Sequence, residues 1–107
     1  MSARITHPQA INLSKSLIES TPENLKKVFF SDNGSTSIEV AIKMCLQFWK
    51  NKGSKEKNQF LVFEGGYHGD TVGAMSISKG SGFFNNYKDL LFGVRSWPFP
   101  ETWRGGH

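Results

Sequence analysis

The chain has 107 residues, of which 37% are apolar and 21% charged, and its net charge at pH 7 is +4. The sequence contains no run of about 18 apolar residues that would predict a membrane span, and its N-terminus lacks the apolar stretch of a secretory signal. Cys45 is the single cysteine, so an internal disulfide is excluded, and the three histidines show no zinc-site spacing. We therefore expect one domain at most, in the cytoplasm, with no metal and no membrane contact.

The first predicted element is a helix over about residues 7 to 20. Thr6 and Gln9 have the spacing of a capping box, and Pro8 is tolerated in a first helical turn. One face then carries apolar residues at helical spacing: Ala10, Leu13 and Leu17, joined by Ile11 and Ile18. Pro22 ends this helix, and the apolar run at 28–30 predicts a short buried strand.

The second predicted helix runs from about residue 35 to 50. Its polar residues form one narrow stripe on an otherwise apolar surface, namely Glu39, Lys43, Gln47 and Lys50. Thr36 and Glu39 fit a capping box. Asn33 and Gly34 between apolar runs are also a hairpin signal, so strand, turn, strand is the alternative. A helix this apolar predicts cover on several sides, by a sheet and by a further layer or a partner chain.

The positive charge is concentrated around the end of this second helix. Five of the thirteen cations lie there: Lys43, Lys50, Lys52, Lys55 and Lys57. Lysines in a last helical turn and the following loop are typical of a solvated helix end, where they complement the helix dipole. No arginine-rich stripe accompanies them, so nucleic-acid binding is not expected and is kept only as a minor alternative.

The remaining elements complete an α/β pattern. A polar loop at 53–59 leads to a second buried strand at 60–63, and the two strands with the helix between them predict a βαβ unit with parallel strands. Residues 71–78 predict a short helix, 79–89 a loop, and 91–94 the start of a third strand. Both glycine-bearing turns follow strands, at the sheet edge where α/β proteins bind ligands.

The first of these turns delivers Gly34 and Ser35 to a helix N-terminus. Unpaired backbone N–H groups and the helix dipole make such a turn a seat for phosphate. Gly34 admits an anion close to the backbone, and the Ser35 hydroxyl adds a donor. The sequence lacks the nucleotide P-loop and the dinucleotide motif, so a single phosphate monoester is the better hypothesis. Taken alone, the turn equally allows Ser35 to be only a helix cap.

The second turn places Tyr67 between glycines and ahead of Asp70. An aromatic ring in this setting can lie against a planar ligand. Asp70 is either an acceptor in the pocket or the N-cap of the helix at 71–78, and the residues by themselves favour the cap. His68 is expected to be a hydrogen-bonded structural histidine, and Cys45 to pack in the core.

Several segments together resemble the class III, fold-type I pyridoxal-phosphate aminotransferases. They are Val28-Phe-Phe-Ser-Asp-Asn-Gly-Ser35, Glu39-Val-Ala-Ile-Lys43, Gly66-Tyr-His-Gly-Asp-Thr71 and Pro98-Phe-Pro-Glu-Thr-Trp103. The resemblance implies that residues 1–107 are one incomplete segment of a three-layer, pyridoxal-phosphate-binding large domain. It implies that Gly34 and Ser35 bind the cofactor phosphate, that Tyr67 stacks on the pyridine ring, and that Tyr67 and Asp70 line the substrate pocket.

The same resemblance implies a homodimer that acts on a small-molecule amino donor and acceptor. The family's Schiff-base lysine and the aspartate that pairs with the pyridinium nitrogen belong to motifs expected after residue 107, and Met1 aligns inside the family's chain. No catalytic residue is therefore assigned, and we expect the chain to be inactive alone, with exposed strand edges and poor solubility. A non-catalytic α/β module that binds a phosphate ligand is the alternative.

Overall fold

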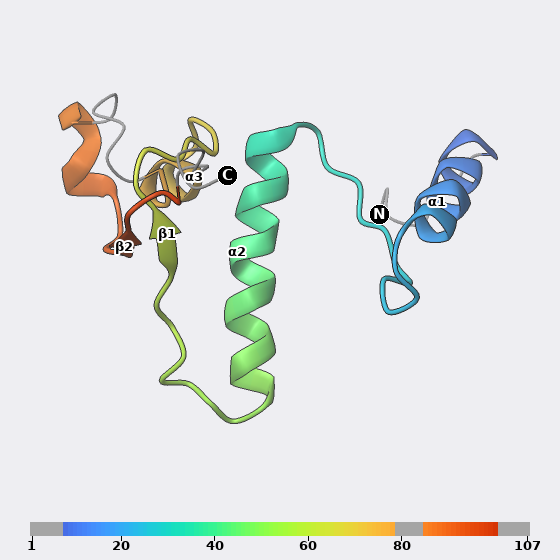
Figure 1. The fold of residues 1–107 in the computed structure, drawn as a ribbon, viewed down its shortest axis with the longest axis horizontal. Coiled ribbons are helices and arrows are strands. Elements are labelled where there is room, and N and C mark those ends of the chain that lie inside the picture. Colours follow the sequence, from blue (N-terminus) through green and yellow to red (C-terminus); the bar gives the residue numbers. More distant parts are fainter. Residues whose placement is uncertain (1–7, 79–84, 101–107) are drawn as a thin grey trace, which may run out of the picture. The chain divides into compact units, whose positions relative to one another are not determined.

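The computed structural model describes residues 8–78 and 85–100, which form short helices and one small sheet (Figure 1). The order is α1 (Pro8–Ser20), α2 (Gly34–Asn51), β1 (Leu61–Phe63), α3 (Val72–Ser76), the 3-10 helix η2 (Asn85–Leu90) and β2 (Arg95–Trp97). The chain divides into two compact units, Met1–Phe30 and Ser31–His107, and each is described by itself.

The first unit contains α1, whose predicted extent is confirmed. Side-chain hydroxyl groups donate hydrogen bonds to backbone carbonyls at the end of α1. Ser20 Oγ donates to the Ser16 carbonyl at 2.7 Å, and Thr21 Oγ1 donates to the Leu17 carbonyl at 2.9 Å. None of the α1 residues is buried. The predicted cap at Thr6 lies outside the described residues.

The predicted strand at 28–30 is wrong for this structure. These residues have no regular secondary structure, and Phe29 and Phe30 are 65% and 49% exposed. A strand needs a neighbour to satisfy its backbone groups, and the described residues form a single two-stranded sheet that does not include this run. The apolar pattern is therefore present without the pairing that would make it a strand.

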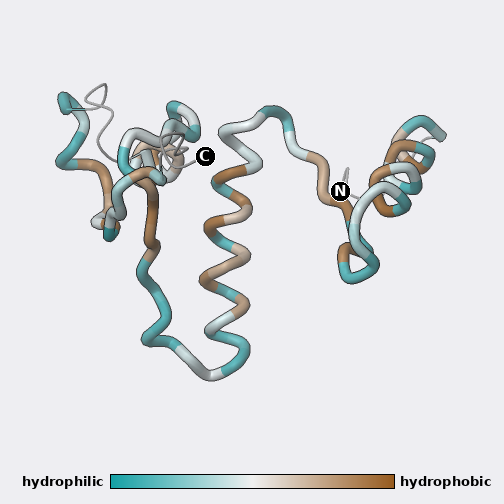
Figure 2. The backbone as a smooth tube through the Cα atoms, in the orientation of Figure 1, coloured by the Kyte–Doolittle hydropathy of each residue, from teal (hydrophilic) through white to brown (hydrophobic). Residues whose placement is uncertain are grey.

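The helix α2 is confirmed, and the hairpin alternative is excluded. Its capping box differs from the predicted one, because Asn33, in extended conformation, is the N-cap. The Thr36 N–H donates to Asn33 Oδ1 at 2.9 Å, and the Asn33 N–H donates to Thr36 Oγ1 at 3.1 Å. Figure 2 shows the apolar residues recurring along α2.

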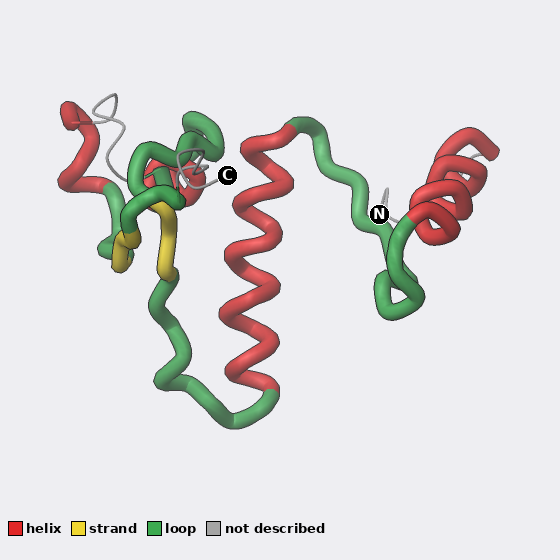
Figure 3. Tube along the Cα trace, in the orientation of Figure 1, coloured by secondary structure: helices red, strands yellow, loops and turns green. Residues whose placement is uncertain are grey.

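The sheet is a parallel pair, β1 and β2, drawn in yellow in Figure 3. Val62 of β1 lies opposite Ser96 of β2. An α/β unit with parallel strands is thus confirmed, but its members differ from the prediction: β1 pairs with Arg95–Trp97 across α3 and η2. The third strand begins at residue 95 rather than 91. The predicted short helix is α3, residues 85–89 belong to η2 instead of a loop, and 79–84 lie outside the described residues.

The core of the described residues is small and centres on α3. Its apolar members are Ala74 and Met75 of α3 and Ile42 of α2, and Ser76 and Ser78 are buried beside them. Large apolar side chains elsewhere are exposed, including Met44 and Phe48 on α2 and Leu61 and Phe63 on β1. The expected exposure of apolar surface is therefore observed. No helix among the described residues is long and apolar enough to cross a membrane.

Candidate functional site

The two glycine-bearing turns line one pocket, although only the second of them follows a strand of the described residues. The pocket measures about 500 Å³. Its lining comes from the start of α2 and from the turn after β1, and consists of Asn33, Gly34, Ser35, Ile38, Tyr67, His68 and Gly69. Segments more than thirty residues apart in the sequence therefore meet at the N-terminus of α2.

The start of α2 presents backbone donors to this pocket. Asn33 accepts hydrogen bonds from the N–H groups of Thr36 and Ser37. Its side chain accepts the bond from Thr36, and its carbonyl accepts the bond from Ser37 at 3.1 Å. Within the described part of the chain, no backbone bond is donated by the N–H groups of Gly34 or Ser35. A Cβ added at Gly34 would meet nothing within 4 Å, so the space beside these donors is open. The arrangement suits an anion.

Asp70 connects the two sides of the pocket. Its backbone N–H donates to Ser35 Oγ at 3.3 Å, and its Oδ1 accepts a 2.6 Å hydrogen bond from the Tyr67 hydroxyl. Because Ser35 Oγ accepts this bond, its own proton remains available to a ligand. Tyr67 is 57% exposed, so a planar molecule can reach its side chain.

The interpretation of Asp70 as a helix cap is corrected by this geometry. The N-cap of α3 is Thr71, which makes no side-chain cap bond, and the Asp70 carboxylate accepts from Tyr67 instead. The hydrogen bond to Asp70, then burial and the Asp70 charge, raise the pKa of the Tyr67 phenol above its ordinary value. Each of these causes favours the neutral phenol, which is the form that can donate the bond.

Gly69 allows the turn to approach Ser35. Its φ of +131° is rarely adopted by residues with a side chain, and a Cβ there would overlap the Ser35 hydroxyl and lie 3.1 Å from the Ala74 Cβ. The next anchor is the His68 N–H, which donates to Ser78 Oγ at 2.9 Å. In this hydrogen bond the donor is the backbone of His68, and the bond holds the turn against Ser78, two residues after α3 ends.

Glu39 is the residue whose role the sequence analysis missed. It was expected to cap α2, but its Oε2 accepts from Thr71 Oγ1 at 2.5 Å and from the Ala74 N–H at 2.8 Å. The sequence feature that could have predicted this role is the spacing of Glu39 from Ser35, because residues four apart on a helix share a face. Both side chains contact the segment that follows β1.

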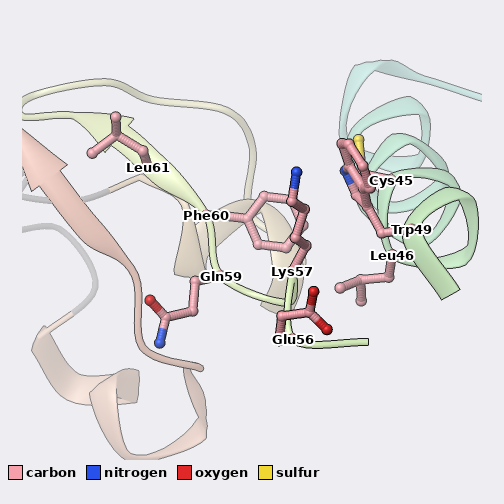
Figure 4. Close-up of a pocket in the computed structure, with 8 residues that line it drawn as sticks. All are labelled: Cys45, Leu46, Trp49, Glu56, Lys57, Gln59, Phe60 and Leu61. Atoms are coloured by element: carbon pink, nitrogen blue, oxygen red, sulfur yellow. The ribbon is translucent and has the colours of Figure 1, made fainter. Parts of the chain in front are cut away.

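A second pocket, of about 400 Å³, lies beside the C-terminal half of α2 (Figure 4). It is lined by Cys45, Leu46 and Trp49 of α2 and by Glu56, Lys57, Gln59, Phe60 and Leu61. The Lys57 ammonium lies 3.8 Å from the centre of the Trp49 ring, a cation–π contact. Cys45 is exposed, so its expected packing in the core is wrong. Among the described residues no cluster of side chains could hold a metal ion.

The fold and the first pocket define a segment of an α/β protein with a ligand pocket at a helix N-terminus and an exposed tyrosine on its rim. Residues 1–105 match the family model described as aminotransferase class-III, and the chain belongs to this family. The resemblance noted in the sequence is thereby confirmed. Membership implies pyridoxal phosphate as the cofactor of the family to which the segment belongs.

Relatives of known name agree with this assignment. The chain is 48% identical over 103 residues to the adenosylmethionine-8-amino-7-oxononanoate aminotransferase of Synechococcus elongatus, which covers 96% of the chain and 24% of the relative. It is 53% identical over 88 residues to the protein of that name from Buchnera aphidicola, covering 81% of the chain and 20% of the relative. The chain therefore spans about a fifth to a quarter of the length of these relatives.

Solved structures show the same fold. The adenosylmethionine-8-amino-7-oxononanoate aminotransferase of Methanocaldococcus jannaschii superposes with a TM-score of 0.82 at 39% identity, over 88% of this chain and 22% of that one. An amine transaminase from an uncultivated Pseudomonas species, solved in its pyridoxal-phosphate-bound form, gives 0.77 at 31% identity, over 91% and 22%. The chain is thus part of a fold-type I aminotransferase domain.

Proposed function

We propose that the chain is a segment of an adenosylmethionine-8-amino-7-oxononanoate aminotransferase, the biotin-pathway enzyme that makes diaminopelargonate with S-adenosyl-L-methionine as amino donor. The proposal is supported by the repeated occurrence of that name among relatives 43% to 53% identical to the chain. The structural observation that carries the proposal is that the Gly34 and Ser35 donors and the Tyr67–Asp70 pair lie at the same pocket.

The pocket fits the cofactor of the family. The open space beside Gly34 and the N–H groups of Gly34 and Ser35 suit a phosphate, and the exposed face of Tyr67 suits a pyridine ring. When bound, pyridoxal phosphate supplies the electron sink for amino-group transfer. The chain's own residues would bind and orient the cofactor: the Ser35 hydroxyl would donate a hydrogen bond to the phosphate, and Asp70 Oδ1 would hold the Tyr67 phenol in place.

Turnover is not proposed for the chain alone. An aminotransferase needs a lysine that holds the cofactor and moves protons, and the described lining of the pocket contains no lysine. We propose that the 107-residue chain carries part of the cofactor site and no catalytic residue. The same proposal, by family, places the complete enzyme in the cytoplasm as a homodimer acting on small molecules.

The test is a titration of the purified chain with pyridoxal phosphate, followed by cofactor absorbance and tryptophan fluorescence. Ser35→Ala and Tyr67→Ala should each weaken binding, the first by about tenfold or more because a hydrogen bond to a charged group contributes roughly 1.5 to 3 kcal/mol. Ser16→Ala and Tyr87→Ala, at exposed positions outside the pocket, are the matched controls and should bind as the unaltered chain does.

Other outcomes of this titration would separate the alternatives. Equal affinity for a simple phosphate monoester, unaffected by Tyr67→Ala, would favour the non-catalytic phosphate-binding module. Amino-group transfer by the chain alone would contradict the proposal that it lacks the catalytic lysine. Absence of any binding would mean that the segment does not hold the cofactor by itself, and the proposed partial site would be abandoned.

A further inference from the structure

Glu39 connects α2 with the start of α3, and it is not among the residues that the proposed function places in contact with the cofactor. The residue is half-buried, one turn after Ser35 on α2, and its Oε2 accepts from the Thr71 hydroxyl at 2.5 Å and from the Ala74 N–H at 2.8 Å. Ala74 is completely buried. The carboxylate therefore reaches from α2 into the core at the start of α3.

The start of α3 needs such an acceptor. The helix has five residues, and its N-cap Thr71 makes no side-chain cap bond within its own segment. Unpaired N–H groups in a first helical turn favour a carboxylate, which satisfies a donor and interacts well with the helix dipole. Glu39 supplies this cap from another element, so the orientation of α3 depends on α2.

This cap also fixes the turn that precedes α3. Asp70 is adjacent to Thr71, and its backbone donates to Ser35 on the same face of α2 that carries Glu39. Two points on one helix face thus hold the segment that presents the Asp70 carboxylate to Tyr67. We propose that Glu39 is a positioning residue of the pocket: its hydrogen bonds to Thr71 and Ala74 set the Tyr67–Asp70 pair against Ser35.

Gly73 provides the space in which the Glu39 carboxylate lies. The residue is buried, and a Cβ there would approach the two carboxylate oxygens to 2.5 and 2.6 Å. Since the carboxylate is the end of a flexible side chain, it would have to move away. Gly73→Ala therefore displaces the acceptor while the charge of residue 39 is retained. This makes Gly73→Ala an independent way to break the same bonds.

The test follows the ionisation of the Tyr67 phenol by ultraviolet absorbance in the 107-residue chain without cofactor. A Tyr87→Phe background leaves one tyrosine, because the chain has two. Glu39→Ala removes both bonds, whereas Glu39→Gln keeps a carbonyl oxygen that can accept them. Glu19→Ala, at an exposed position of α1, is the matched control.

We expect Glu39→Ala and Gly73→Ala to lower the raised pKa of Tyr67 toward its ordinary value, seen as a severalfold larger ionisation constant. Glu39→Gln and Glu19→Ala should keep the raised pKa. A Glu39→Ala chain with unchanged helical circular dichroism and an unchanged pKa of Tyr67 would overturn the proposal, as would a Glu39→Gln chain that behaves like Glu39→Ala.

If Glu39→Ala fails to fold, Thr71→Val and Gly73→Ala decide the question. Thr71→Val removes one of the two bonds and should lower the pKa of Tyr67 in part, and no change in either variant would overturn the proposal. The role in an aminotransferase rests on the proposed function, but the phenol titration contains no cofactor. Failure of the cofactor titration and failure of the positioning role are therefore measured separately.

Discussion

At the scale of single residues, Tyr67 and Asp70 form the contact with the clearest dependence on pH. The neutral phenol donates the 2.6 Å hydrogen bond to Asp70 Oδ1, whereas a phenolate would face the carboxylate with like charge. The pKa of Tyr67 is raised from 10.0 by this bond, by burial and by the charge of Asp70. The stabilising contact is therefore fully present below pH 10.0 and is lost as the pH rises through the higher pKa of the folded chain.

Asp70→Asn should lower the pKa of Tyr67 toward its ordinary value. The amide retains an acceptor but loses the negative charge, so the phenolate is opposed less strongly. The measurement is an absorbance titration between neutral and strongly alkaline pH in the Tyr87→Phe background. Asp89→Asn, in η2 and exposed, removes an equal charge away from the pocket and serves as the control. An unchanged titration in Asp70→Asn would show that the charge of Asp70 does not govern the ionisation of the Tyr67 phenol.

At the scale of elements, the start of α2 determines where the backbone donors of the pocket lie. Asn33 satisfies two N–H groups of the first turn, and the N–H groups of Gly34 and Ser35 border the open space. The same side chain therefore begins the helix and leaves those donors available. The predicted capping pair was Thr36 and Glu39, but Glu39 is used by α3 instead.

Asn33→Ala should destabilise α2 by about 1 kcal/mol, the typical cost of removing a side-chain N-cap. The measurement is the loss of helical circular dichroism during urea titration. Asn58→Ala is the matched control, since Asn58 lies in the exposed loop before β1 and its side chain takes no part in a cap. Equal urea midpoints for the two variants would contradict the capping role of Asn33.

The strands illustrate the limit of local patterns at this scale. The apolar runs at 28–30 and 60–63 have the same character, yet only the second becomes a strand, because β2 lies beside it. The partner strand begins at Arg95, four residues after the predicted start. Its residues Arg95, Ser96 and Trp97 are not an apolar run, so pairing rather than composition made them a strand.

At the scale of the whole chain, the described residues expose more large apolar side chains than they bury. The apolar core has three members, whereas Met44, Phe48, Leu61, Phe63 and Trp97 are each at least half exposed. Exposed apolar surface of this extent, together with unpaired strand edges, favours association. The relatives are about four times as long as the chain, since 103 matched residues make up 24% of one and 88 make up 20% of the other, so in them additional sequence is available to cover such surface.

The isolated chain should therefore associate as its concentration rises, and Met44→Lys should reduce this association by placing a charge on the exposed apolar surface of α2. Sedimentation velocity over a range of concentrations measures the effect. Gln47→Lys adds the same charge at an exposed polar position of α2 without removing an apolar side chain, and should change association less. A strictly monomeric chain, or equal effects of the two variants, would contradict the role of this surface.

The sequence by itself determined the α/β class, the two principal helices, the family and the two turns that line the pocket. These features follow from local signals: helical periodicity, glycines at turns and short motifs with fixed spacing. The tertiary structure decided the pairing of β1 with β2, the use of Glu39 as the cap of α3 and the bond from Tyr67 to Asp70. Strand pairing and contacts between helices depend on which groups meet in space, and a one-dimensional pattern contains no distances between remote residues.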